Sequence, residues 1–574
     1  MIKYPVDYFA TVFGLNVITL GYTQKMKQIN KSRTLQIIVF FIFLHTIAIT
    51  PFWNKDGMII PKLIIIFTLS MYLFPIIIIN RNHMLSSKIA KFVVIIQCVL
   101  LIQNLIVLIT SSAPLEQQIF GRTGRGLGLV TTFSLAIILI ATMLLVENNK
   151  KNHILFGLII SGFISSLYSV LQSFGIDLLR WESRTNGVIG TLGNPNFQSA
   201  FAAVVLVPSV LYFSKNRKQY FLAFLSFMFF SFTIYRTQST QGIIAGFFSI
   251  AIALIIFSWY RNKLLFGFML LSGFVSSLFA ILGMLNMGPM SGYLYKVSVQ
   301  SRGDFWRAAF NTANDNPIFG VGLDSFGDYS LQYRDQIAAN HSFAEYTDNA
   351  HNFFLEHAAT GGYPSAILNL LIVISVLFAF VIIQRDIKKF DVTIVSLFSA
   401  WAAFQMTTVI SPGNLVTMHW NAIISGAIIG IAKFVSPTQV PISKVSENKI
   451  KNPSLVSLIF SITALVVIFP VFNVDRMQLT GMQTGDANLV MRATTSYPES
   501  TVRYSLIGQE LLNSGLHQQS LELARAGIEF NPHSPGLWAL ILVNPNAQKA
   551  ERLEAKERIL ELDPLNVEVQ NFIP

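Results

Sequence analysis

One histidine and a group of arginines are the residues of this chain that could carry chemistry. The segment Ala350-His351-Asn352 places a histidine directly before a helix-like apolar stretch. A histidine titrates near neutral pH and can therefore accept a proton from a hydroxyl group. Arginine presents a planar fork of N–H groups that binds phosphate bidentately. Together these residue types could activate a hydroxyl group and stabilise a departing phosphate. No Asp-x-Asp motif suggests a metal ion.

The composition places these residues in a membrane protein. The chain has 574 residues, of which 52% are hydrophobic and only 12% are charged, about half the charged share of a soluble domain. Apolar runs of roughly 16–23 residues alternate with short charged segments, and this length spans a bilayer as an α-helix. Disorder, a collagen-like fibre and a disulfide-stapled module are excluded, the last because Cys98 is the single cysteine. In a membrane protein the location of the charges matters more than their sum. The net charge of +12 is therefore not taken to indicate a nucleic-acid partner.

The elements that must position the chemistry are membrane helices. We predict an all-α polytopic membrane protein with about 13 transmembrane helices, one large extracytoplasmic loop and a small C-terminal helical-repeat domain. The predicted spans are residues 35–52, 59–79, 89–111, 127–146, 154–176, 197–213, 220–235, 243–259, 264–285, 364–383, 392–410, 420–435 and 455–472. No cleavable signal peptide is expected, because the first 34 residues lack a basic start followed by an apolar stretch.

The distribution of basic residues predicts the topology. One alternating set of connecting segments, which begins with residues 1–34, holds about twice as many Lys and Arg as the other set, and most are Lys. The predicted domains are thus a cytoplasmic segment 1–34, a transmembrane domain 35–472 that contains the large loop 286–363, and an extracytoplasmic tail 473–574. We expect the protein in the cytoplasmic (inner) membrane, in contact with membrane lipids.

Arginines are unusually common on the predicted outer side. They are Arg122, Arg125, Arg180, Arg184, Arg236, Arg302, Arg307 and Arg334. Positive charge is disfavoured on that side, so an anionic ligand is one explanation. Pairing with acidic residues such as Asp177 and Asp304, or with lipid headgroups, is an equally good alternative for any one of them.

The tail changes composition towards Glu, Gln, Arg and Ala. Residues 501–530 predict two amphipathic helices joined near Gly515, and residues 535–562 predict a second unit. The period of about 32 residues resembles tetratricopeptide repeats of roughly 34 residues, although an undefined pair of helical hairpins fits nearly as well. Either structure suggests a module that binds a protein partner and carries no catalytic residues.

Short motifs in the large loop give the chain a family resemblance. The loop carries Ser301-Arg302-Gly303-Asp304-Phe305-Trp306-Arg307, then Asn316-Pro317-Ile318-Phe319-Gly320-Val321-Gly322, then Ala350-His351-Asn352 followed by Gly361-Gly362. The segment Gly193-Asn194-Pro195-Asn196 lies upstream. Over residues 35–435 the chain resembles the O-antigen ligase family of membrane glycosyltransferases, which includes polymerases and protein O-oligosaccharyltransferases. Relatives often have Ser-Arg-Gly near residue 239, where this chain has Ser239-Thr240-Gln241 with Arg236 as the nearest arginine.

The resemblance implies a function and a set of site residues. It implies transfer of a glycan from a polyprenyl-pyrophosphate-linked donor to an extracytoplasmic lipid, glycan or protein acceptor, with no metal and no cofactor. His351 would be the base and Arg302 the leading pyrophosphate contact. Further substrate contacts would come from Arg307, Arg122, Arg125, Arg184, Arg236 and Asn352.

Other functions remain open at this stage. A transporter or flippase of lipid-linked sugars would need ionisable residues near the bilayer midplane, and the spans offer little besides His45. A scaffold organised by the tail is a third hypothesis. His341, His351 and His357 could be metal ligands, but on one helix residues 351 and 357 would lie about 240° apart.

Overall fold

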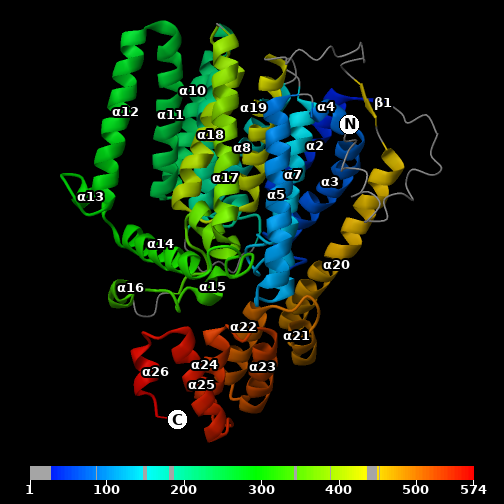
Figure 1. Ribbon diagram of the computed structural model, residues 1–574, viewed down its shortest axis with the longest axis vertical. Helices are drawn as coiled ribbons and strands as arrows, with labels where there is room; N and C mark the ends of the chain where they lie inside the picture. Colours follow the sequence, from blue (N-terminus) through cyan, green and yellow to red (C-terminus); the bar gives the residue numbers. More distant parts are fainter. Residues whose placement is uncertain are drawn as a thin grey trace, which may run out of the picture.

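The protein is an all-α polytopic membrane protein, with its helices gathered in one bundle that carries a smaller helical domain at one end (Figure 1). The computed structural model describes residues 28–85, 87–146, 151–179, 187–341, 346–387, 389–435, 449–451 and 453–573. Residues 1–27 of the predicted N-terminal segment, and Arg180 and Arg184, lie outside these ranges.

Each predicted span overlaps a helix of the structure. The helices are α2 (Lys31–Ile47), α3 (Ile60–Ile79), α5 (Lys88–Thr110), α7 (Leu129–Leu145), α8 (Lys151–Ser173), α9 (Pro195–Phe213), α10 (Tyr220–Arg236), α11 (Thr240–Arg261), α12 (Lys263–Met284), α17 (Phe353–Asp386), α18 (Val392–Ile410), α19 (Leu415–Val435) and α20 (Ser454–Thr484). Among the described residues, 10 helices are long and apolar enough to cross a membrane. The helices α2, α7 and α10 have 17 residues each and are shorter than that criterion. The prediction of an all-α polytopic fold is confirmed.

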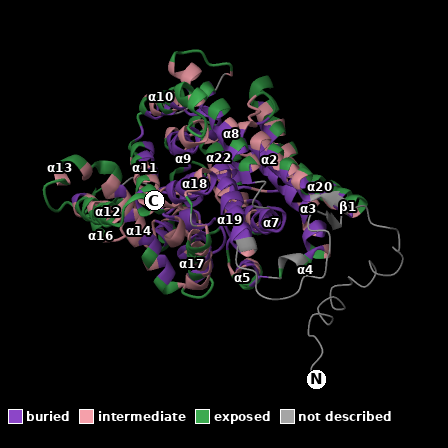
Figure 2. Ribbon diagram, turned by 90° about the horizontal axis from the view of Figure 1, so that it is seen from above, coloured by how far each residue is buried: buried purple, intermediate pink, exposed green. Residues whose placement is uncertain are grey.

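The bundle has a buried centre and an apolar outer surface. Helices α9, α18 and α19 contribute much of the buried core, including Phe201, Phe404 and Trp420 (Figure 2). By contrast, α12 buries only Gly283 and leaves large apolar side chains such as Phe274 exposed. A helix that is apolar all round and exposed in the protein fits contact with lipid tails.

The large loop forms an ordered layer across one end of the bundle. It consists of α13 (Ser291–Leu294), α14 (Val297–Asp315), α15 (Phe326–Tyr329), α16 (Gln336–His341) and the first turns of α17. The short connecting helices are α4 (Arg81–Met84), α6 (Leu115–Phe120), η2 (Gly190–Leu192) and η3 (Arg217–Gln219). At the opposite end, β1 (Gln28–Asn30) and β2 (Lys449–Lys451) form a short antiparallel pair, which the sequence did not predict.

The tail lies at the same end of the bundle as the large loop (Figure 1). Its helices are α21 (Ala487–Thr494), α22 (Thr501–Asn513), α23 (His517–Phe530), α24 (Pro535–Val543), α25 (Lys549–Leu562) and α26 (Val567–Asn571). Gly515 separates α22 from α23 with a φ of 78°, the left-handed conformation in which glycine commonly ends a helix. The last span, α20, continues to Thr484 as one helix, so it runs across the predicted domain boundary at 472–473.

The tail is fixed to the loop by buried polar contacts. The Arg334 guanidinium donates two hydrogen bonds of 3.0 Å to the carboxylate of Asp563, and both side chains are almost fully buried. Asn531 donates to Asp328 over 3.1 Å in a second contact. A buried charge is costly without its partner, so these pairs hold the tail in one position on the loop.

Candidate functional site

His351 lies in the turn that leads into α17. Asn352 is the N-cap of this helix, and its side-chain oxygen accepts hydrogen bonds from the backbone N–H groups of Phe354 (3.0 Å) and Leu355 (3.1 Å). Its amide nitrogen donates to the carbonyl of Val409 at the end of α18, over 3.1 Å. An asparagine at this position satisfies N–H groups that the helix itself leaves free. Asn352 was predicted to contact substrate, and the structure gives it a place in the scaffold.

A break in α17 separates the site from the membrane span. The helix axis is interrupted at Gly362, whose φ is 75° and ψ is 170°. The turn from Pro317 to Gly322 binds this break, because Val321 N–H donates to Ala359 O (2.9 Å) and Tyr363 N–H donates to Pro317 O (2.8 Å). The Pro-x-x-Gly-x-Gly motif therefore acts here as a backbone brace for α17.

Glycine is required on both sides of this brace. A Cβ on Gly362 would lie 2.3 Å from the carbonyl oxygen of Ile318, and a Cβ on Gly320 would lie 2.4 Å from the backbone carbon of Thr360. Both residues also have positive φ, which side chains with a Cβ rarely adopt. The spacing of these glycines thus sets the direction in which α17 leaves the site.

The His351 ring is partly buried and lies close to two arginines. It packs against Phe305 of α14 with ring centroids 5.4 Å apart, and its Nδ1 atom is buried without a hydrogen-bond partner among the described residues. Burial lowers the pKa of His351 to about 4, and the charges of Arg125 and Arg302 contribute in the same direction. The imidazole is therefore neutral at pH 7 and able to accept a proton.

Arg302 has no acidic partner among the residues that the structure describes. It lies on α14 one turn before Phe305, the residue that packs on His351. Its side chain is half-buried, and within the described residues it forms no ion pair or hydrogen bond. Burial lowers the pKa of Arg302 with no nearby carboxylate to raise it. A desolvated guanidinium without a counter-ion favours an anionic ligand.

Arg125 and Arg122 lie near the site but are already paired. Arg125 binds the carboxylate of Asp348 through two nitrogens, one of them over 2.8 Å. Arg122 donates to Asp328 over 2.7 Å and also to the hydroxyl of Tyr346. The Asp348 carboxylate loses stability by burial but gains more from Arg125, so its pKa is below the usual value. Arg122 and Arg125 are thus paired with carboxylates of the protein. This agrees with the alternative explanation of the outer arginines, in which they pair with acidic residues.

The remaining predicted contacts are dispersed. Arg307 binds Asp304 over 2.6 Å and also pairs with Asp335. Arg236 donates to the carbonyl of Ser173 at the end of α8 and lies over the ring of Phe174. Arg184 falls outside the described residues. Of the predicted site residues, Arg302 and Arg125 thus lie close enough to His351 for their charges to affect its pKa.

Two acidic residues at the site were not predicted. Asp324 accepts hydrogen bonds from the backbone N–H groups of Arg122 (2.7 Å) and Leu127 (3.0 Å), and burial raises its pKa to about 6. Glu356 accepts from Ala350 N–H over 2.8 Å, while its second carboxylate oxygen is buried without a partner among the described residues. Both line a cavity of about 80 Å³ with Asn349. Glu356 could have been recognised in the sequence, because an acidic residue in the first turn of a helix is stabilised there.

His351 and His357 do not lie on one helix, as the argument against a metal site assumed. His351 precedes α17 and has a φ of 53°, so the helical angle between residues 351 and 357 does not apply. His357 lies within α17, and its ring contacts that of Phe353 at 4.4 Å. His341 is on α16 and binds Asp304 over 3.0 Å. Among the residues that the structure describes, no three His, Cys, Asp or Glu side chains are grouped to hold a metal.

Fold and site define a class of protein. It is a multi-pass membrane protein whose large loop holds a neutral histidine just before a broken helix, near an arginine that has no partner among the described residues. Residues 221–370 match the family model described as O-antigen ligase. The match extends from α10 to the membrane part of α17 and includes both the Arg302 and the His351 motifs. This part of the chain is therefore similar to the O-antigen ligase family, which supports the resemblance seen in the sequence. No curated protein matches the chain.

Proposed function

We propose that the protein transfers a glycan from a polyprenyl-pyrophosphate-linked donor to a hydroxyl group of an extracytoplasmic acceptor. The observation that supports this most is the half-buried Arg302, unpaired among the described residues, beside the neutral imidazole of His351. These two side chains supply a base and an anion contact within one partly buried site. The acceptor, whether lipid, glycan or protein, is defined only as a carrier of the attacking hydroxyl.

The proposed reaction is a single displacement at the anomeric carbon of the donor sugar. The acceptor oxygen attacks this carbon while its proton moves to the ring of His351. The bond from the anomeric carbon to the pyrophosphate oxygen breaks, and polyprenyl pyrophosphate leaves with the electron pair. Arg302 stabilises the negative charge that develops on the leaving group, because a guanidinium in a poorly solvated site interacts strongly with phosphate.

The proposal also fixes the orientation of the protein. The large loop and the tail would face the extracytoplasmic side of the inner membrane, with the N-terminus in the cytoplasm, as the distribution of Lys and Arg indicates. The tail would present its helices to a protein partner or an acceptor on that side. Its repeat period in the sequence resembles that of tetratricopeptide repeats. The family match favours transfer over the transporter alternative.

Substitutions of His351 and Arg302 test the two roles separately. His351→Ala should lower the single-turnover rate by roughly 100- to 10,000-fold and leave donor affinity largely unchanged, because only proton transfer is removed. Arg302→Lys keeps the charge but loses the planar fork, so it should still lower the rate by about 30- to 1000-fold. Arg302→Ala should in addition weaken donor binding.

The measurements use purified protein in nanodiscs, a defined lipid-linked glycan and a defined acceptor. Arg385→Ala, at the far end of α17, is the matched control and should behave as the unmodified protein. Near-normal transfer by His351→Ala would remove the base assignment. Unchanged donor affinity in Arg302→Ala would remove the pyrophosphate role.

A further inference from the structure

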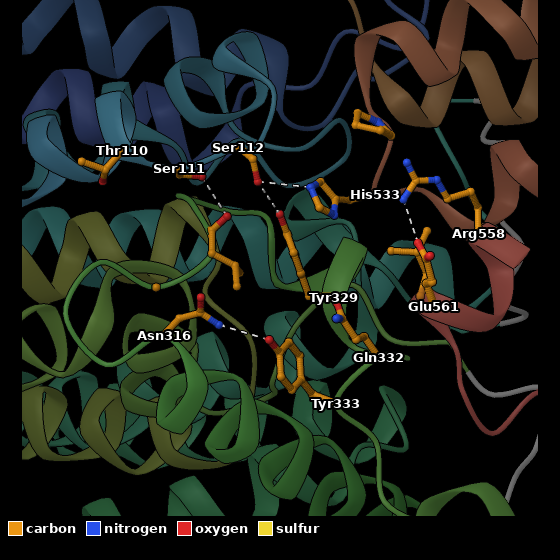
Figure 3. Close-up of a pocket in the computed structure, with 14 residues that line it drawn as sticks. Thr110, Ser111, Ser112, Asn316, Tyr329, Gln332, Tyr333, His533, Arg558 and Glu561 are labelled. Carbon is orange, nitrogen blue, oxygen red and sulfur yellow. Dashed lines mark hydrogen bonds and ion pairs between the residues drawn. The ribbon is translucent and has the colours of Figure 1, made fainter.

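A second cavity lies where the large loop meets the tail, away from the His351 ring. Its volume is about 450 Å³, which is within the range of small-ligand sites in proteins. The residues come from three parts of the chain: the end of α5, the large loop, and the tail segment around His533 together with α25 (Figure 3). The junction between two folded units is a common place for a binding site.

The lining is rich in neutral hydrogen-bonding groups. The hydroxyl of Ser112 lies 3.1 Å from that of Tyr329 and 3.2 Å from Nε2 of His533, and these side chains point toward one another in Figure 3. Asn316 shares a hydrogen bond of 3.3 Å with the hydroxyl of Tyr333. The amide of Gln332 also lines the cavity and has no partner among the described residues. Hydroxyl and amide groups of this kind both donate and accept hydrogen bonds.

The cavity offers no free charge. Arg558 is paired with Glu561 over 2.7 Å. Burial lowers the pKa of His533 and raises the pKa of Tyr329 to about 12, so both side chains are neutral at pH 7. A phosphate or carboxylate would find no unpaired cation here, in contrast to the surroundings of Arg302. The electrostatics therefore favour an uncharged polar ligand.

The lining of the cavity also includes aromatic rings. The rings of Tyr329 and His533 lie with centroids 4.8 Å apart and planes inclined by 31°, and the ring of Tyr333 lines the same space. Aromatic rings provide broad apolar faces beside their polar edges. A ligand that matches both features has hydroxyl groups around its rim and C–H groups on its faces, which is the chemistry of a pyranose sugar.

We propose that this cavity binds a neutral saccharide. The site is continuous with the brace of α17, because Gly320 and Val321 line it and Val321 also donates to Ala359 O. This proposal rests on the proposed function for the origin of the sugar, which is either the distal part of the donor glycan or a glycan of the acceptor. Occupation of the cavity would hold one substrate against both the loop and the tail.

Ligand-observed saturation-transfer NMR on the full-length protein in nanodiscs tests the binding itself. The probes are glucose, galactose, mannose, N-acetylglucosamine and N-acetylgalactosamine, with glucuronic acid as the charged comparison. At least one neutral sugar should bind, and Gln332→Ala should weaken it by roughly fivefold or more because one hydrogen-bonding partner is lost. Gln336→Ala, an exposed amide on α16 outside the cavity, is the matched control and should leave binding unchanged.

Further variants keep the test decisive. Tyr333→Phe removes only the hydroxyl that contacts Asn316 and should also weaken binding, so it replaces Gln332→Ala if that variant does not fold. His351→Ala should bind the sugar as well as the unmodified protein does. Absence of binding by every neutral sugar, binding of glucuronic acid alone, or equal binding by Gln332→Ala and Tyr333→Phe would overturn the proposal.

Transfer kinetics distinguish the two origins of the sugar. If the donor glycan occupies the cavity, Gln332→Ala should raise the KM for the donor and leave the KM for the acceptor unchanged. If the acceptor glycan occupies it, the same variant should raise only the KM for the acceptor. No change in either KM would overturn a part for the cavity in transfer. If the unmodified protein binds neutral sugars at this cavity but transfers no glycan, the proposed function fails while the saccharide site stands.

Discussion

His351 has a backbone conformation that its neighbours must maintain. Its φ of 53° is in the left-handed region, which costs about 1 kcal/mol or more for a residue with a Cβ. Asn349 accepts the His351 N–H over 2.8 Å, and Trp306 donates to the His351 carbonyl over 3.4 Å. Such strain is typical of functional sites in which one side chain must be aimed precisely. Here it directs the ring towards Phe305 and away from the helix that follows.

At the residue scale, the pH dependence of transfer should report the pKa of His351. Because this pKa is about 4 in the free protein, the ring is neutral above that pH and protonated below it. We expect kcat/KM to be flat on the acid side down to about pH 5 and to fall as the pH passes through 4. Arg302→Gln removes a positive charge that lowers the pKa, so the acid limb should move to higher pH.

The measurement is kcat/KM for the donor between pH 3.5 and 8, in protein shown to stay folded over that range. Arg385→Gln, at the far end of α17, serves as the control for removing an arginine away from the site. An acid limb near pH 6.5 that Arg302→Gln leaves in place would contradict this account of the histidine.

At the scale of elements, the site depends on how α17 begins and where it breaks. The loop turn around Gly320 binds the helix at Ala359 and Thr360, and the amide of Gln103 on α5 donates to Ile318 O (2.7 Å) and Gly361 O (3.1 Å). Two transmembrane helices and one loop thus share a single hydrogen-bonded junction. The N-terminal turns of α17 carry Glu356 and follow His351 directly, so a shift at this junction would move the site.

Gly362→Ala should destabilise this junction. The added Cβ would meet backbone atoms of Ile318 at 2.3 Å and 2.4 Å and would sit on a residue with positive φ, which together should cost roughly 2–4 kcal/mol. We expect a lower unfolding midpoint in thermal denaturation of the purified protein and a lower transfer rate in the fraction that stays folded.

Gly267→Ala in α12 is the matched control, because its Cβ would meet no atom within 4 Å. Alanine has the higher helix propensity, so this variant should be as stable as the unmodified protein or slightly more so. Equal unfolding midpoints for the two variants would show that the break at Gly362 is not a constraint.

At the scale of the whole molecule, the tail is docked on the loop rather than carried on a free linker. The side chains of Arg334 and Asp563, which form an ion pair, are only 5% and 3% exposed. A second contact joins the tail to the segment between α6 and α7, where the hydroxyls of Thr123 and Ser500 lie 2.7 Å apart. The tail also supplies His533 and the Arg558–Glu561 pair to the cavity beside the loop. Its position therefore determines the shape of that cavity.

Removing one partner of the buried ion pair should release the tail. Arg334→Ala leaves the Asp563 carboxylate buried without its counter-charge, a change that typically costs 3–5 kcal/mol. We expect faster amide hydrogen exchange in α24 and α25 and faster proteolysis between α20 and α22. The double variant Arg334→Met with Asp563→Leu should recover most of the protection, because an apolar pair of similar volume replaces the charges. Unchanged exchange in Arg334→Ala would show that the pair does not hold the tail.

The orientation of the molecule can be measured with introduced cysteines. In a Cys98→Ser background, Gln336→Cys in the loop and Ser514→Cys in the tail are both at exposed positions. A membrane-impermeant maleimide applied to intact spheroplasts should label both, since both face the outside in the predicted topology. Labelling of both only after the membrane is opened would reverse the topology.

The sequence by itself determined the features that depend on local composition. The length of each apolar run predicts a membrane helix, because a bilayer of fixed thickness demands about 20 apolar residues wherever they occur in the chain. The glycines at 320, 322 and 362 were recognisable as a motif, and Gly515 marked the turn between α22 and α23, because these signals concern neighbouring residues. The histidine and arginines of the loop were visible for the same reason.

Only the tertiary structure decided which arginines are available to a ligand. Arg122 is paired with a carboxylate 206 residues away and Arg125 with one 223 residues away, and no local pattern indicates such partners. Arg302 has no partner within the described residues because α14 places it beside Phe305 and His351 rather than beside an acid. Whether a charge is neutralised depends on what folding brings within a few ångströms of it, and that follows from the packing of the helices.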